Sequence, residues 1–275
     1  MSKIRIACET YTWQMPGEMY KGRLGHIMKT ANTAGFSGIE PETSFFGDLT
    51  DPLKMKDALQ QNGLELTALC HVEDWRNTIE TDEERMHSDQ WLEFLKHFPE
   101  AMYLLVQMPG TDRKDLRERQ QNLLSCVNSI AERASYVGTK CSYHPNSPEG
   151  SIYRTEVDYE TLLNGLNGDW IGYTPDVGHM AKVNMDPLTI IKQYRELINL
   201  VHYKDMYADG RWAATGDGVI EFEQITQYLI DTGYEGWIVM EDECDKAIID
   251  PDGVTLDDGN WISRQLIPLV DQNQL

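Results

Sequence analysis

The sequence predicts an α/β fold, a (β/α)8 TIM barrel that forms a single domain over residues 1–275. Short apolar runs rich in β-forming residues alternate with longer stretches in which apolar residues recur at helical spacing. Eight such runs in 275 residues correspond to about 34 residues per unit, which is the size of one βα repeat. The predicted strands are residues 4–8, 38–41, 64–71, 102–108, 139–144, 170–175, 200–203 and 237–240.

The predicted helices lie between these strands. The clearest covers residues 116–136, and another covers 222–229 and ends before Thr232 and Gly233. In four places a glycine stands just before a predicted strand, as expected of a residue that ends a helix in the left-handed conformation. One face of the clearest helix carries Leu123, Leu124, Val127, Ile130 and Ala134, and the four glycines are Gly35, Gly63, Gly138 and Gly233.

An open, doubly wound sheet is the alternative arrangement for such an alternation. That fold usually binds a nucleotide through a glycine-rich loop after its first strand. Neither GxGxxG nor GxxxxGK[ST] follows residues 4–8. The closed barrel is therefore the prediction, and its catalytic residues are expected at the carboxyl ends of the strands.

The composition restricts the class of partner. Acidic residues outnumber basic ones by 45 to 24, so the formal charge of −21 disfavours binding to nucleic acid or to an anionic membrane surface. No apolar run approaches the ~18 residues of a membrane-spanning helix, and the first residues lack the apolar core of a signal peptide. The five cysteines form no CxxC pair, so we expect reduced thiols in a cytoplasmic protein.

Polar side chains gather at the predicted carboxyl ends of the strands. Four of the seven histidines lie there, and carboxylates alternate with them over the last four strands, which are neighbours in a barrel. Two imidazoles and two carboxylates at one mouth are ligands typical of Mn, Fe, Co or Zn, and are less natural for Mg. For each histidine alone, a hydrogen-bonded position in a loop is the alternative. These histidines are His71, His144, His179 and His202.

Several motifs, most of them in the second half of the chain, resemble those of one family. Residues 176–179 (DVGH) and 201–205 (VHYKD) resemble the DxGH and HxKD motifs of the sugar phosphate isomerase/epimerase family. The runs 216–222 and 233–241 resemble its GxGxIDF loop and its last strand, and 35–40 resembles its second strand. This family has a xylose isomerase-like barrel and is related to inosose dehydratases, ketose 3-epimerases and endonuclease IV.

The resemblance implies one divalent metal ion, manganese or another of the metals above, at the ends of strands five to eight. His144 departs from the pattern of many relatives, which have a glutamate there, although inosose dehydratase-like members often have a sequence similar to Tyr-His-Pro at 143–145. With one carboxylate fewer, epimerisation by two opposed glutamates is disfavoured, which leaves isomerisation or loss of a β-hydroxyl. The implied ligands are His144, Asp176, His202 and Glu241.

The implied function belongs to carbohydrate metabolism: a metal-dependent isomerase or epimerase that acts on a small keto-sugar or polyol through an enediolate. One alternative is a dehydratase or lyase, either inosose dehydratase-like or acting by β-elimination on a 3-keto-glycoside. Another is a non-catalytic barrel that binds a sugar. A DNA-repair endonuclease is disfavoured by the charge and by Gln107, which stands where that enzyme would need a metal-binding histidine.

Roles follow from the chemistry of proton abstraction next to a carbonyl, which needs a positioned base. Glu241, Glu40 or His179 is expected to take the proton. Lys204 is expected to bind a substrate hydroxyl or the enediolate oxygen, and neutralisation of Glu40 or Asp176 is the alternative. The predicted substrate contacts are His71, Glu73, Trp13 and Gln107. A capped loop is the alternative for His71 and Glu73, and plain packing is the alternative for Trp13.

The expected partner is a small sugar or polyol without a phosphate group. The glycine-rich loop near the last strands, residues 216–218, carries an acid of its own and makes a poor anion site. No nucleic acid and no membrane is expected to bind. A homodimer, the commonest oligomer, is compatible with the apolar residues in the predicted helix over 81–98.

Overall fold

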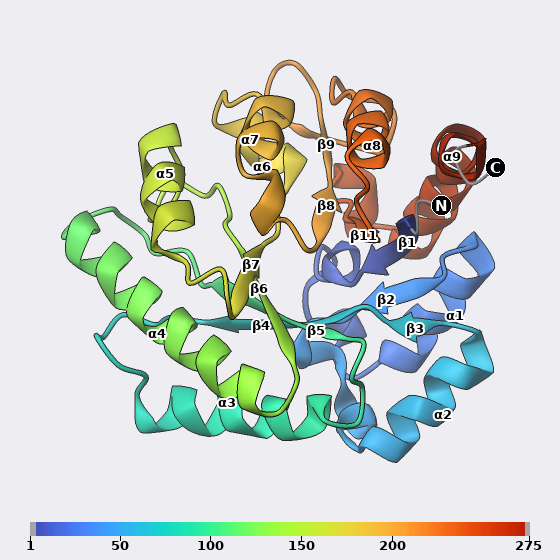
Figure 1. The fold of residues 1–275 in the computed structure, drawn as a ribbon. Coiled ribbons are helices and arrows are strands. Elements are labelled where there is room, and N and C mark those ends of the chain that lie inside the picture. The colour runs from blue at the N-terminus through green and yellow to red at the C-terminus, as the bar shows by residue number, and fades with distance from the viewer. Residues whose placement is uncertain (1–3, 273–275) are drawn as a thin grey trace. The chain divides into compact units, whose positions relative to one another are not determined.

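The computed structural model describes residues 4–272 (Figure 1). The chain divides into two compact units, and each is described by itself. Unit 1 comprises Met1–Thr67 and Leu200–Leu275, and unit 2 comprises Ala68–Asn199. The expectation of a single domain over residues 1–275 stays a prediction.

Unit 1 contains a five-stranded sheet with the order β3-β2-β1-β11-β8, in which every neighbouring pair is parallel. The carboxyl ends of its strands therefore lie along one edge of the sheet. A short antiparallel ribbon, which the sequence analysis did not predict, follows β8. The strands are β1 (Ile4–Glu9), β2 (Gly38–Glu40), β3 (Glu65–Leu66), β8 (Val201–Tyr203), β9 (Asp205–Met206), β10 (Trp212–Ala213) and β11 (Gly236–Met240).

The helices of unit 1 bury one apolar face each. The first, α1, buries Leu24, Ile27, Met28 and Ala31 and ends at Gly35, whose φ of 92° is in the left-handed region that favours glycine. The α-helices are α1 (Leu24–Ala34), α2 (Pro52–Asn62), α8 (Phe222–Asp231) and α9 (Pro251–Gln272), and the short 3-10 turns are Tyr11–Trp13, Gly17–Tyr20, Thr43–Phe45, Gly47–Thr50 and Asp245–Ile248.

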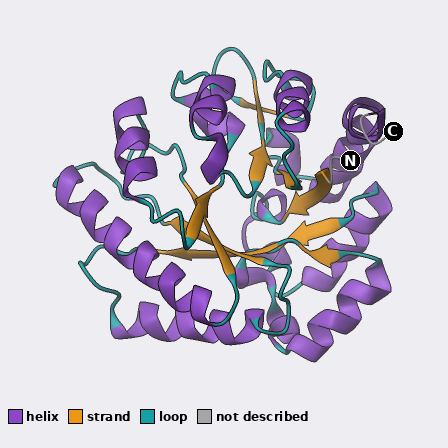
Figure 2. Cartoon of the chain, viewed as in Figure 1, coloured by secondary structure: helices purple, strands orange, loops and turns teal. Residues whose placement is uncertain are grey.

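Unit 2 contains a four-stranded parallel sheet with the order β4-β5-β6-β7. A helix connects each strand of this sheet to the next (Figure 2). Two of its helices begin with a capping box, at Thr81 and Thr155. The elements are β4 (Ala68–Glu73), α3 (Asp82–Leu95), β5 (Met102–Gln107), α4 (Leu116–Tyr136), β6 (Lys140–His144), α5 (Glu156–Gly165), β7 (Ile171–Tyr173), α6 (Val177–Lys182), α7 (Pro187–Gln193) and a 3-10 turn at Arg195–Leu197.

The structure confirms the eight predicted strands and the helix over 116–136, with one correction. The run predicted as one strand over 64–71 is two strands, β3 and β4, and the second continues to Glu73. The run changes its partner at Thr67: the N–H of Thr67 donates to Ile39, whereas β4 pairs with β5 from Ala68 onward. No described helix is long and apolar enough to cross a membrane.

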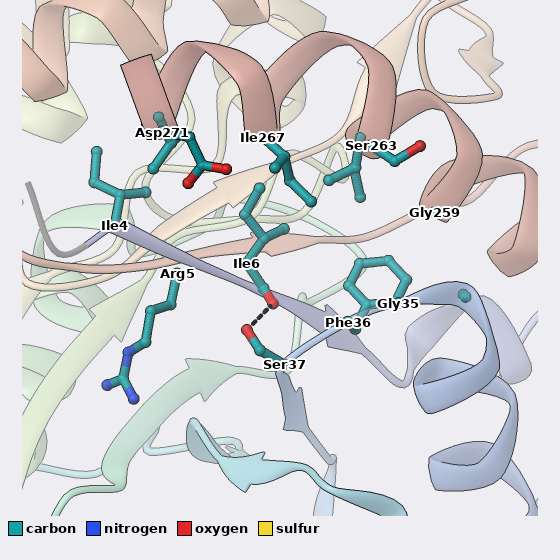
Figure 3. Close-up of a pocket in the computed structure, with 13 residues that line it drawn as sticks. Ile4, Arg5, Ile6, Gly35, Phe36, Ser37, Gly259, Ser263, Ile267 and Asp271 are labelled. Atoms are coloured by element: carbon teal, nitrogen blue, oxygen red, sulfur yellow. Dashed lines mark hydrogen bonds between the residues drawn. The ribbon is translucent and has the colours of Figure 1, made fainter. Parts of the chain in front are cut away.

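A hollow of about 300 Å³ lies in unit 1 beside the first half of β1 and is covered by α9 (Figure 3). Apolar side chains such as Ile4, Ile6 and Ile267 line it, and its polar groups include Arg5 and Ser37. It borders the amino-terminal half of β1, whereas the predicted site residues stand at the carboxyl ends of the strands. The hollow is therefore a feature of helix packing rather than part of the predicted site.

The contact between α1 and α9 gives a stability prediction. A Cβ added at Gly259 would lie 2.0 Å from the backbone oxygen of Ala34, so α9 must move away from α1. We expect Gly259→Ala to lower the free energy of unfolding by about 1–3 kcal/mol. The matched control is Gly25→Ala on the exposed side of α1, where no atom lies within 4 Å.

Gly25→Ala should raise the free energy of unfolding by about 0.5–1 kcal/mol, because alanine is the better helix former. Urea denaturation followed by circular dichroism measures both variants. Equal stability of Gly259→Ala and the wild type would show that α1 and α9 do not pack as closely as the structure has them.

Candidate functional site

In unit 1, a buried histidine lies between two carboxylates at the carboxyl edge of the sheet. His202 of β8 has its Nε2 3.0 Å from Oε1 of Glu40 and its Nδ1 3.4 Å from Oε2 of Glu241. Glu40 ends β2 and Glu241 directly follows β11, so two more parallel strands supply these acids. All three residues are buried. The sheet thus brings three of the predicted site residues together.

The electrostatics of this group favour a cation. Burial alone would lower the pKa of His202, but the charges of Glu40 and Glu241 outweigh burial and raise this pKa well above its ordinary value. Glu9, at the end of β1, is also buried, and its pKa is raised well above the usual range by burial and by the charges of Glu241 and Glu40. A positive charge among these acids is therefore stabilised, whether it is a proton on His202 or a metal ion.

Lys204 is fully buried beside the same acids. Its Nζ lies 2.6 Å from Oε1 of Glu241 and forms a second ion pair with Glu243. The Nζ is also 5.1 Å from the centre of the Trp212 ring and 5.7 Å from that of Tyr11, so aromatic faces surround the ammonium group.

Glu243 is a residue of this group that the sequence analysis missed. Burial raises its pKa to about 7, and the charge of Glu241 adds to this effect while the ammonium group of Lys204 opposes it. The sequence feature that could have indicated Glu243 is the acidic run of residues 241–243 after the last strand. Its pairing with Lys204 depends on side-chain positions that strand spacing does not determine.

Asp205, the last residue of the motif that contains His202 and Lys204, organises a loop. Its carboxylate accepts hydrogen bonds from the N–H groups of Gly216, Gly218 and Ile220 at 2.9, 3.0 and 3.2 Å. A Cβ at Gly218 would lie 2.2 Å from Oδ1 of Asp205, so the loop needs glycine to approach so closely. Asp205 therefore holds the start of the run 216–222, which resembles the GxGxIDF loop of the family, in its conformation.

Unit 2 contributes a second histidine–carboxylate pair. His144 ends β6, and Asp176 follows β7 as the residue that caps α6. The Nε2 of His144 lies 3.5 Å from Oδ2 of Asp176, and both side chains are buried. The other oxygen of Asp176 accepts a hydrogen bond of 2.7 Å from the backbone N–H of His179. This pair contains two of the four predicted metal ligands.

His179 is buried next to this pair. Its ring contacts the ring of His144 edge-on, with centres 5.6 Å apart, and its Nδ1 lies 2.8 Å from the hydroxyl oxygen of Ser147. The structure thus places His179 beside two predicted ligands, and the hydrogen bond of Ser147 orients its ring.

The other predicted site residues have partners within their own units. Trp13 is fully buried and donates from its indole nitrogen to Asp252 of α9 at 2.8 Å. Gln107 donates from its side chain to the backbone oxygen of Asp74 at 2.8 Å. The contact of Trp13 agrees with its packing alternative, and the roles of both residues in substrate binding stay predictions.

His71 and Glu73 meet a histidine that the sequence analysis did not consider. Oε1 of Glu73 lies 3.4 Å from Nε2 of His71 and 2.6 Å from Nδ1 of His87, which stands on α3. The hydrogen bond from His71 lowers the pKa of Glu73 most strongly, and the bond from His87 adds to this against the opposing effect of burial. No strand-end rule could have found His87, because it lies on a helix.

Comparison with known proteins identifies the family. A family model described as the xylose isomerase-like TIM barrel matches residues 28–265. The chain belongs to the xylose isomerase-like TIM barrel family. The predicted α/β barrel class and the predicted resemblance are thereby confirmed.

Curated relatives and solved structures agree with this family. The inosose dehydratase of Bacillus licheniformis is 25% identical over 280 residues, with 89% of each chain covered. That of Lacticaseibacillus casei is 28% identical over 149 residues, a match that spans 48% of this chain and about half the length of that relative. A crystal structure of the IolI protein with a zinc atom superposes with a TM-score of 0.76 at 14% identity and covers 98% and 99% of the two chains.

Proposed function

We propose that this protein is a divalent-metal-dependent enzyme that removes a proton next to the carbonyl group of a small keto-sugar or cyclic keto-polyol. The observation that carries the proposal is the buried group around His202, with Glu40 at 3.0 Å, Glu241 at 3.4 Å and Lys204 paired with Glu241. This group combines carboxylates that can accept a proton with the ammonium group of Lys204, which can donate a hydrogen bond to an oxygen atom of the substrate. Buried ionisable groups at the carboxyl ends of parallel strands are typical of a catalytic site.

The proposed metal ligands are those that the sequence resemblance implies. Unit 1 offers His202 and Glu241, and unit 2 offers His144 and Asp176. Each pair consists of one imidazole and one carboxylate, donors that suit Mn, Co, Zn or Fe better than Mg. The acids around His202 favour a cation, which fits such an ion. When bound, it would supply Lewis acidity to a substrate carbonyl.

The side chains of the protein would bind substrate and move the proton. Glu241 or Glu40 would take it, since both carboxylates lie at the carboxyl edge of unit 1, and His179 is the third candidate. Lys204 would donate a hydrogen bond to a hydroxyl or to the developing oxyanion. Its buried position and its ion pairs hold the ammonium group in place.

Loss of a β-hydroxyl is the outcome that we propose first. The inosose dehydratase that aligns with 89% of the chain supports it, as does a histidine at position 144 instead of a second metal-binding glutamate. Isomerisation or epimerisation is the second candidate. The observation in its favour is the number of buried acids in unit 1, because Glu9, Glu40 and Glu241 offer more than one proton acceptor.

Incubation in D2O with an inosose or a ketohexose, in the presence of Mn, Co or Zn, tests the proposal. Isomerisation or epimerisation places deuterium at a carbon next to the carbonyl group. Dehydration removes the proton from that carbon together with the β-hydroxyl, and the resulting enol takes up deuterium at the former β-carbon when it becomes a ketone. NMR detects the deuterium in both outcomes. Mass spectrometry then separates them, because dehydration removes one water whereas isomerisation leaves the mass of the sugar unchanged apart from deuterium. Absence of both exchange and product with all three metals would exclude this chemistry for the substrates tested.

We also propose a cytoplasmic location and a small-molecule partner in preference to nucleic acid. All five cysteines are buried and free, which suits a reducing compartment. The charge of −21 opposes binding to phosphate backbones. Manganese as the preferred metal and a homodimeric state are further proposals that derive from the sequence resemblance and from the frequency of two-fold oligomers.

A further inference from the structure

A second group of metal-type side chains lies in unit 2, between strand β4 and helix α3. It consists of His71 and Glu73 of β4 and His87 of α3. One possible ligand atom from each residue lies within 4.8 Å of those of the other two. Oε1 of Glu73 is 3.4 Å from Nε2 of His71 and 2.6 Å from Nδ1 of His87. None of the three belongs to the proposed ligand set of the catalytic metal.

The distances suit a tetrahedral ion after a small movement. Donors that are about 2.0–2.1 Å from a zinc-like ion stand about 3.3 Å apart at tetrahedral angles. The separation between Glu73 and His71, 3.4 Å, is close to this value, and that between Glu73 and His87, 2.6 Å, must widen by about 0.7 Å. The side chain of His87 is 37% exposed, so it has room to make that adjustment.

The second nitrogen of His71 has the partner that a metal-bound imidazole requires. Nδ1 of His71 lies 2.5 Å from the hydroxyl oxygen of Tyr103 on β5, and the two rings are stacked with centres 5.6 Å apart. Without an ion, Nε2 of His71 makes its hydrogen bond with Glu73. With an ion bound, the proton of the ring would lie on Nδ1 and be donated to Tyr103, and the lone pair of Nε2 would be free to bind the ion. Such outer partners orient histidine ligands in metal sites.

We propose that His71, Glu73 and His87 bind a divalent transition metal ion of the zinc and cobalt class, with water completing its coordination. Glu73 is 20% exposed and His87 is 37% exposed, so solvent reaches two of the three ligands. The ion would link β4 to α3 across the segment 74–81. It would thus stabilise this corner of unit 2 independently of catalysis. In this site His71 and Glu73 are metal ligands, not direct contacts of the substrate.

Titration of the full-length, chelator-stripped protein with Co²⁺ tests the proposal. Visible absorption reports the coordination of cobalt by nitrogen and oxygen donors, and elemental analysis after desalting gives the number of ions retained per chain. We expect His87→Ala to retain one ion fewer than the wild type. Glu73→Gln should lose the same ion, and circular dichroism verifies that both variants are folded.

A matched control and a positioning variant sharpen the test. His97→Ala removes another exposed histidine just beyond α3 and should bind as many ions as the wild type. Tyr103→Phe keeps all three ligands but removes the hydroxyl group, so it should weaken the binding of this one ion about 10–100-fold. A purely structural role of Tyr103 would lower stability without changing cobalt affinity.

The catalytic metal is distinguished by a separate variant. Asp176→Asn should lose an ion but keep the one that depends on His87. If Asp176→Asn binds as the wild type does while His87→Ala loses one ion, the site proposed here stands and the proposed catalytic ligand set fails. If His87→Ala and Glu73→Gln retain as many ions as the wild type, with the same affinity, the present inference is wrong.

Discussion

Replacement of Glu241 by glutamine should remove both the catalytic metal ion and turnover. The change keeps the size of the side chain but replaces the carboxylate by a neutral amide. In the wild type, the oxygens of this carboxylate lie 3.4 Å from Nδ1 of His202 and 2.6 Å from Nζ of Lys204. We expect kcat/KM to fall at least about 10³-fold, because a proton acceptor and a ligand are lost together. Steady-state kinetics with the substrate found in the D2O assay, together with elemental analysis, measure both effects.

Glu243→Gln is the matched control for this variant. Glu243 is two residues away, is partly buried and also pairs with Lys204, but it is not among the proposed ligands. It should keep the ion and lose far less turnover than Glu241→Gln. If the two variants lose turnover equally and both retain metal, the charge around Lys204 matters rather than ligation. Turnover of Glu241→Gln within about tenfold of the wild type would remove Glu241 from the mechanism.

The alternation of predicted strands and helices was enough to predict at which edge of each sheet the polar side chains lie. Residues at strand ends, such as Glu40, His144 and His202, needed only the βα alternation to be placed on the correct edges of their sheets. That information is local, because a buried strand ends close to where its apolar run ends. The split at Thr67 was not predicted for the same reason: a change of hydrogen-bonding partner leaves the apolar run unbroken.

Contacts between side chains of different elements were beyond such prediction. The ion pair of Lys204 with Glu243 and the contact of Glu73 with His87 each join residues from two elements through their rotamers. For Trp13, the sequence predicted a loop position near the substrate but not the hydrogen bond from its indole nitrogen to Asp252 on the last helix. In all these cases the partner lies on another element of the fold, and only tertiary packing determines it.

Replacement of Lys204 by methionine should have the largest effect on stability. Lys204 is fully buried, and its ammonium group opposes the charges of Glu241 and Glu243 in a unit that also buries Glu9 and Glu40. In Lys204→Met, these carboxylates lose their positively charged partner in a buried site, where little water is present to solvate them. We expect the free energy of unfolding to fall by about 3–5 kcal/mol, the usual result when one partner of a buried ion pair is removed.

Urea denaturation in the presence of a chelator measures this loss without help from a bound ion. The control Lys29→Met, on the exposed side of α1, should change the free energy of unfolding by less than about 0.5 kcal/mol. Adding Glu243→Gln to Lys204→Met should restore part of the stability, because one uncompensated carboxylate is then removed. If the double variant is no more stable than Lys204→Met, the loss of stability comes from lost packing around the lysine and not from the uncompensated charge of Glu243. Recovery would mean that Lys204, for which we propose contact with a substrate oxygen, also makes a buried acidic site compatible with a stable fold.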